Sequence, residues 1–237
     1  MLTIPAVRVP AAERLRKFST LGAIALSLAL VGCATSVITP ELEQELGNQI
    51  AHEVQEQVGL YQDDELRNYL RSVGTRLVTA LPETPYQFQF DIVDQGEPNA
   101  FASPGGYIFV SRGLLAQMNS EDELAGVLAH EISHVTRRHH AKQVGRSIRA
   151  GFLSLPGKAV GVVNQSWGQR ISDAGKIYLA SYSRDQETEA DQYGMRLAAS
   201  AGYDPAELAG ALEGIEASVE LISGESHQAT FFDTHPT

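Results

Sequence analysis

The feature that most constrains this chain is the motif His-Glu-Ile-Ser-His at residues 130–134, which lies in a segment with the signals of a helix. Ser120 is a good N-cap, and Glu123, three residues later, completes a capping box. Apolar residues then recur at helical spacing and define one buried stripe, namely Leu124, Val127, Leu128 and Val135. The sequence therefore predicts an amphipathic helix that starts after Ser120 and ends near Gly145.

Within such a helix, the two histidines and the glutamate of the motif share one region of the surface. At about 100° per residue, His130 and His134 project only about 40° apart, and Glu131 reaches the same region from the side. Two neutral imidazoles on one helix face bind Zn²⁺, and an adjacent carboxylate takes a proton from the water that the metal activates. The motif is therefore typical of a zinc metallopeptidase, provided that a third protein ligand exists.

One candidate for the third ligand is His140, which follows His134 by six residues. Metzincin peptidases place a third histidine at this spacing, but they have glycine where this chain has Arg137, a good helix former. On a continuing helix, His140 is rotated about 240° from His134. In that case, His139 and His140 belong with Arg137 and Arg138 to a solvated basic face.

The other candidate is Glu187, which forms an E-x-x-x-D pair with Asp191. In thermolysin-like gluzincins, the glutamate of such a pair binds zinc and the aspartate orients a histidine ligand. The spacing is about one helical turn, so both carboxylates lie on one helix face, whereas Glu189 is rotated about 200° from Glu187 and faces away. We favour Glu187 over His140; the alternative for the pair is a solvated acidic helix face.

Three blocks of the sequence resemble the family of HtpX/BepA/LoiP-type zinc metallopeptidases. They are residues 99–115 (NAFASPGGYIFVSRGLL), 123–134 (ELAGVLAHEISH) and 183–191 (SRDQETEAD). The resemblance spans about Glu41 to the C-terminus, which makes residues 41–237 one peptidase domain. It implies an α+β fold, mainly α, of the zincin-like type, with a small β-sheet whose edge strand borders the active-site cleft.

The resemblance also implies the roles of individual residues. One Zn²⁺ per chain is bound by His130, His134 and Glu187. Glu131 is the general base, and Asp191 is the carboxylate that holds a ligand histidine. Tyr178, Tyr182 and Arg184 are near Glu187 in the sequence, but nothing selects one of them to stabilise the oxyanion.

Two further segments acquire a role through the resemblance. The segment of residues 99–110 is predicted to form two short strands around a Pro-Gly-Gly turn. The family places a strand there beside the cleft, and a peptide substrate adds to such an edge as a further strand; this strand comprises Gly105, Gly106, Tyr107, Ile108 and Phe109. Thr234-His235-Pro236 resembles a family motif in which a histidine occupies the open zinc position and holds the enzyme latent.

The other helices and the first strand are predicted from hydrophobic periodicity and from the residues that interrupt helices and strands. The sequence predicts helices over residues 41–60, 63–81, 111–118, 176–201 and 205–222 and a strand over residues 86–92. Residues 146–175 lack clean periodicity and are open to two interpretations, a flap or a pair of weak helices.

The N-terminus has the features of a bacterial lipoprotein signal. Basic residues precede an apolar run over residues 18–31, which ends in Leu-Val-Gly-Cys, and about 14 residues are too few for a membrane span of roughly 20. This ending resembles a bacterial lipobox, which implies that residues 1–32 are removed, that Cys33 carries lipid, and that residues 33–40 form a tether; the alternative is an ordinary secretory signal with an incidental cysteine. Ala34 rather than Asp after the cysteine indicates the outer membrane.

The net charge of the chain disfavours two classes of binding partner. The chain carries a formal charge of −11, and removing residues 1–32, which hold four basic residues and one acidic residue, leaves −14. Such an acidic chain is a poor binder of nucleic acid or of anionic lipid, so membrane attachment would come from the N-terminal lipid.

Together these features predict a zinc endopeptidase at the periplasmic face of the outer membrane. Its substrates would be unfolded or misassembled envelope proteins. The alternative is an envelope lipoprotein that acts as a chaperone or assembly factor, with zinc in a structural or latent role. The intact Glu131 favours the enzyme, because a purely structural site has no use for a base there.

Overall fold

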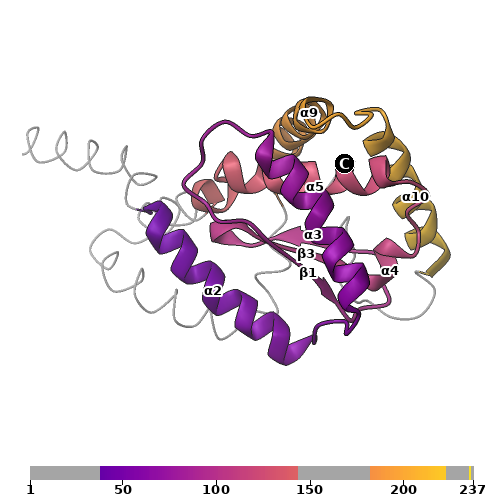
Figure 1. The fold of residues 1–237 in the computed structure, drawn as a ribbon, viewed down its shortest axis with the longest axis horizontal. Helices are drawn as coiled ribbons and strands as arrows, with labels where there is room; N and C mark the ends of the chain where they lie inside the picture. The colour runs from indigo at the N-terminus through magenta and orange to yellow at the C-terminus, as the bar shows by residue number, and fades with distance from the viewer. Residues whose placement is uncertain (1–37, 144–181, 223–234, 236–237) are drawn as a thin grey trace, which may run out of the picture. The chain divides into compact units, whose positions relative to one another are not determined.

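The computed structural model describes residues 38–143, 182–222 and 235. The elements, in chain order, are α2 (Pro40–Gln57), α3 (Asp64–Thr79), β1 (Gln89–Val93), β2 (Ala100–Ala102), the 3-10 helix η2 (Pro104–Gly106), β3 (Tyr107–Ser111), α4 (Arg112–Leu115), α5 (Glu121–Thr136), α9 (Arg184–Ser200) and α10 (Glu207–Ile222) (Figure 1). The predicted α+β fold, mainly α, is confirmed. Residues 1–37 and 146–175, and with them the signal segment, Cys33 and the undecided segment, lie outside the described residues.

The sheet has the strand order β1-β3-β2, with β3 parallel to β1 and antiparallel to β2. Side chains alternate between its two faces. Ile108 and Val110 join the main core, to which α3 and α5 contribute, whereas Phe109 joins a smaller core with Ile50 and Val54 of α2. The sheet therefore lies between α2 on one side and α3 and α5 on the other.

The prediction that residues 105–109 form the edge of the sheet is wrong, because β3 pairs with a strand on each side. Gly105 and Gly106 do adopt positive φ angles of 80° and 104°. A Cβ at Gly105 would lie 2.6 Å from the Cα of Gln44, so the glycine allows α2 to approach this turn closely. Among the strands of the described residues, the outer one that packs against α5 is β2.

Helix α5 is at the centre of the fold. Ser120 caps it, because its Oγ accepts a hydrogen bond from the amide of Glu123 at 3.0 Å, and the Glu123 carboxylate accepts one from the Asn119 amide at 2.7 Å. Every residue from Glu123 to Val135 is buried, since α3, α9, α10 and the sheet all pack against α5. The predicted single buried stripe is therefore wrong: this helix is enclosed on all sides.

Helix α5 ends at Thr136 and not near Gly145 as predicted. Arg138 has a positive φ of 55°, which breaks the helix, and a new helical turn starts at His139. Glu43 of α2 holds Arg138 in this conformation. Its carboxylate accepts a hydrogen bond from Arg138 Nε at 2.9 Å and another from the Tyr86 hydroxyl at 2.6 Å. Contacts with a segment about a hundred residues earlier thus end the helix.

The first described residues are part of this fold. Ile38 is buried, and Thr39 caps α2 by accepting a hydrogen bond from the amide of Leu42 at 3.3 Å. The last residues of the predicted tether therefore pack with the domain. Within the described ranges, none of the helices has both the length and the apolar character that crossing a bilayer requires.

Candidate metal centre

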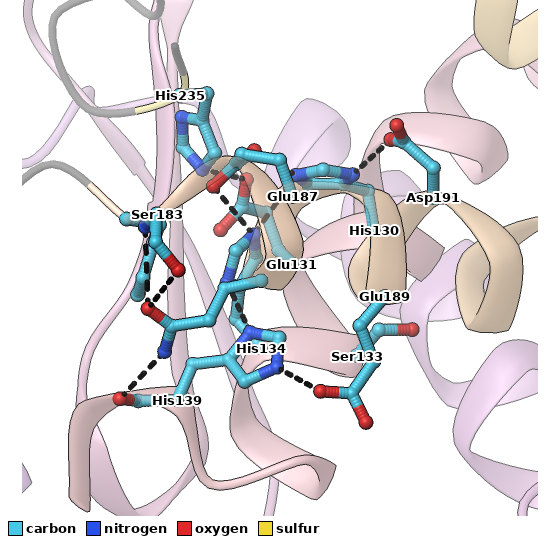
Figure 2. Close-up of polar contacts among 12 residues, drawn as sticks. His130, Glu131, Ser133, His134, His139, Ser183, Glu187, Glu189, Asp191 and His235 are labelled. Atoms are coloured by element: carbon cyan, nitrogen blue, oxygen red, sulfur yellow. Dashed lines mark hydrogen bonds and ion pairs between the residues drawn. The ribbon is translucent and has the colours of Figure 1, made fainter. Parts of the chain in front are cut away.

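Four buried side chains from three parts of the chain meet beside α5. His130 and His134 come from α5, Glu187 comes from the first turn of α9, and His235 comes from near the C-terminus (Figure 2). One potential ligand atom from each lies within 4.8 Å of the other three. The structure thus brings the two motif histidines together with Glu187, and it does not include His140 in this cluster.

The distances within the cluster fit a zinc ion. The Nε2 atoms of His130 and His134 are 2.9 Å apart, and the two carboxylate oxygens of Glu187 lie 3.4 and 3.7 Å from them. Tetrahedral zinc with ligand bonds of about 2.0–2.2 Å separates neighbouring ligand atoms by roughly 3.3–3.6 Å. Moreover, Glu187 Oε1 is buried without a hydrogen-bond partner among the described residues, as expected of an atom that binds a metal.

Helix α9 reaches the cluster because Gly194 lets it pack closely on α5. A Cβ at Gly194 would lie only 3.0 Å from the backbone nitrogen of His130. One turn after Glu187, Asp191 Oδ1 lies 3.0 Å from Nδ1 of His130. Burial lowers the pKa of His130, but the carboxylates of Asp191 and Glu187 outweigh it and raise the pKa to about 10. In the absence of metal, these carboxylates therefore favour a proton on His130.

Glu131 is a buried carboxylate at the edge of the cluster. Its Oε1 atom lies 3.3 Å from Nε2 of His235. Burial by itself raises the pKa of Glu131, but the nearby His235 and His130 reverse this effect and hold the pKa below its ordinary value. The group is thus an anion placed next to the predicted metal ligands, as a general base must be.

Of the three candidates for stabilising the oxyanion, the structure places Tyr182 at the cluster. Its ring stacks on His134 with centroids 3.8 Å apart, and its hydroxyl lies 2.8 Å from Nε2 of His140. Arg184 is exposed at the start of α9, and Tyr178 lies outside the described residues.

The predicted solvated basic face around His139 and His140 is wrong. His140 bonds to Tyr182 and to the backbone of Ala102, and burial lowers its pKa to about 4. His139 is completely buried, with Nδ1 2.9 Å from Nδ1 of His134 and Nε2 3.0 Å from Glu189. The prediction failed because it continued α5 through Arg138.

His139 and Glu189 are thus functional candidates that the sequence interpretation missed. Glu189 does face away from Glu187, as its position on the helix predicts, but it meets the segment after α5 instead of solvent. The available signal was a glutamate two residues from a predicted ligand, together with a basic and histidine-rich segment after the motif. Nothing in that signal indicated that the two meet.

Comparison with known proteins identifies relatives of this domain. The model of the family described as Peptidase family M48 matches residues 64–237. A protein of Vibrio cholerae named putative beta-barrel assembly-enhancing protease is 33% identical over 184 residues, which is 72% of this chain and 37% of that protein. The mitochondrial metalloendopeptidase OMA1 of Schizosaccharomyces pombe is 29% identical over 71% of this chain and 49% of the relative.

A shorter match is to the metalloprotease LoiP of Escherichia coli, which is 32% identical over 140 residues, 58% of this chain and 53% of LoiP. The aligned part of this chain thus spans between 37% and 53% of these three relatives.

Proposed function

The chain belongs to peptidase family M48, a family of zinc metallopeptidases, and we propose that it is an endopeptidase that cleaves unfolded or misassembled proteins of the bacterial cell envelope. The observation that carries this proposal is the buried Glu131 carboxylate next to a cluster that fits zinc. The relatives named beta-barrel assembly-enhancing protease and metalloprotease LoiP are bacterial proteases, and the first name connects its protein to β-barrel assembly. This supports an envelope location and protein substrates.

In this proposal, His130, His134 and Glu187 would hold the ion. When bound there, zinc would lower the pKa of a water molecule to around 7 and polarise the scissile carbonyl. Glu131 takes the proton of the attacking water on its carboxylate and delivers it to the amide nitrogen as the C–N bond breaks. Asp191 orients His130 through Nδ1, and the Tyr182 ring covers one face of His134.

The observed strand order changes the strand along which a peptide substrate is expected to bind. Because β3 is central and β2 is the outer strand packed on α5, we place the extended peptide along β2 and not along residues 105–109. Main-chain hydrogen bonds to an outer strand hold peptides of many sequences, which suits a protease for misfolded proteins.

The decisive experiment compares the purified full chain with its Glu131→Gln variant on an unfolded outer-membrane protein. Loss of a general base lowers the rate by about 10²–10⁴-fold. We expect the variant to keep its zinc and to lose cleavage to this extent. No cleavage by the zinc-loaded wild-type chain would instead favour the alternative, a chaperone-like lipoprotein with structural zinc, whereas cleavage at the wild-type rate by Glu131→Gln would show that Glu131 is not the general base.

His235 supports a second element of the proposal, a latent state. Its ring centroid lies 5.2 Å from those of both His130 and His134, and a ligand atom of His235 belongs to the metal cluster. Since catalytic zinc needs one open position, a fourth protein ligand blocks the reaction until it leaves. We expect His235→Ala to raise proteolysis at equal zinc loading; unchanged activity would remove the latency role.

Attachment to the membrane is proposed through lipid on Cys33, at the periplasmic face of the outer membrane. One acyl chain gives only marginal binding, so the mature protein should carry several. Mass spectrometry of the N-terminal peptide from membrane-extracted protein tests this, and an unmodified Cys33 would contradict it.

A further inference from the structure

The two motif histidines receive different support at the ring nitrogens that face away from the cluster. Nδ1 of His130 meets the Asp191 carboxylate directly, at 3.0 Å. Nδ1 of His134 instead meets another imidazole, that of His139, at 2.9 Å, and His139 in turn meets Glu189 through Nε2 at 3.0 Å (Figure 2). The carboxylate of Asp191 thus contacts His130 directly, whereas the side chain of His139 lies between the carboxylate of Glu189 and His134.

The distances between the ring nitrogens allow only one consistent placement of the imidazole protons on His134 and His139. Because Nε2 of His134 faces His130 and Glu187, binding zinc there requires the proton of His134 on Nδ1. That N–H donates to Nδ1 of His139, which must be unprotonated, so His139 carries its proton on Nε2 and donates it to Glu189. The opposite tautomer of His139 would set two N–H groups against each other at 2.9 Å.

His139 and Glu189, the two groups that follow His134 in this chain of hydrogen bonds, are both held in place. Glu189 accepts a hydrogen bond from Arg137 Nε at 2.7 Å. The carbonyl of His139 accepts a hydrogen bond from Gln186 Nε2 at 3.1 Å. Helix α9 thus fixes His139 by its side chain through Glu189 and by its backbone through Gln186.

We propose that His139 and Glu189 are positioning residues that orient His134 for the metal through a directed chain of hydrogen bonds. The inference rests on the proposed zinc site, and it assigns His134 a partner that Asp191 does not provide. A partner that fixes the tautomer and ring orientation of a ligand histidine typically changes metal affinity by about 10–100-fold. Neither residue supplies a ligand atom to the metal cluster in this role.

The test measures the dissociation constant for zinc in the full chain, by competition with a chromophoric chelator. Glu189→Ala should weaken zinc binding by about 10–100-fold, and Glu189→Gln, which keeps an oxygen to accept from His139, should recover most of the loss. Lys142→Ala is the matched control, because it removes an ion pair from the same carboxylate but leaves the His139 bond intact. It should stay within about twofold of wild type.

A second readout is the tautomer of His139 in the zinc-loaded chain, observed by ¹⁵N NMR of the imidazole rings. We expect the proton on Nε2 in the wild type and a mixture of tautomers in Glu189→Ala.

Three results would overturn the inference: wild-type zinc affinity in Glu189→Ala, an equal loss in Lys142→Ala, or a proton on Nδ1 of His139. A wild-type chain that binds no zinc would overturn the proposed function as well, which separates the two failures.

Discussion

The two halves of α5 are positioned by different kinds of contact. The half that precedes His130 is apolar after its acidic first turn. Its N-terminus is capped by Ser120, and Gly126 brings it against Leu208 of α10, where a Cβ would lie 3.0 Å from the Leu208 Cα. The half that starts at His130 packs on α9 through imidazoles and carboxylates. One continuous helix therefore combines a segment held by apolar packing with a segment that also makes specific polar contacts to α9.

The difference separates stability from metal binding. Apolar burial and a cap stabilise the first half without specifying the direction of any polar atom. In the second half, each ring nitrogen needs a particular partner, and these partners come from α9 or, for Nδ1 of His134, from His139, which α9 holds in place. Substitutions in the first half should therefore lower the free energy of unfolding and spare the metal affinity of the folded protein, and substitutions along α9 should affect metal affinity most.

The largest effect on stability is expected from Leu128→Ala. Leu128 is fully buried in the main core, and such truncations cost about 2–5 kcal/mol. Urea denaturation of the zinc-free protein measures the loss. Leu42→Ala, at an exposed leucine of α2, is the control and should change the free energy of unfolding by less than about 0.5 kcal/mol. A loss of zinc affinity in folded Leu128→Ala would break the distinction between the two halves.

A smaller loss of stability, together with a loss of zinc affinity, is expected from Gly194→Ala. The new Cβ would press on the His130 backbone, and such overpacking costs about 1–3 kcal/mol, offset by about 1 kcal/mol of helix propensity. Because α9 must move away from His130, zinc affinity should fall along with stability. Gly214→Ala is the control, since its Cβ would meet nothing within 4 Å. Unchanged zinc affinity in Gly194→Ala would show that the close approach is not needed.

The smallest effect is expected from Ser120→Ala. Removing the cap of α5 leaves the Glu123 amide without the Oγ acceptor, which costs about 1 kcal/mol. Zinc affinity should be unchanged, because the cap lies ten residues before His130. Ser72→Ala, at an exposed position of α3, is the control and should be close to neutral. A cap variant that binds zinc more weakly would mean that the two halves are coupled.

The features that could be predicted from the sequence are those set by local signals. The starts of α2, α3 and α5 follow from local caps and periodicity, and the structure has them within one residue of their predicted positions. The grouping of His130, His134 and Glu187 was predicted as well, because two motifs with fixed helical spacings and a family resemblance indicated it.

The features that could not be predicted depend on contacts between distant segments. The left-handed Arg138 is held by Glu43, 95 residues earlier, and the burial of His139 depends on Glu189, 50 residues later. The central position of β3 likewise follows from its pairing with two strands and not from its own residues. Helix propensity at Arg137 and Arg138 favoured continuation of α5, and these tertiary contacts override it.

The central claim is that zinc is held by two histidines of α5 and one glutamate of α9. Metal analysis of the full chain and of three variants, His134→Ala, Glu187→Ala and His140→Ala, tests it most directly. We predict one zinc per chain in the wild type and in His140→Ala, and loss of zinc in His134→Ala and Glu187→Ala. Loss of zinc in His140→Ala with full retention in Glu187→Ala would contradict this ligand assignment.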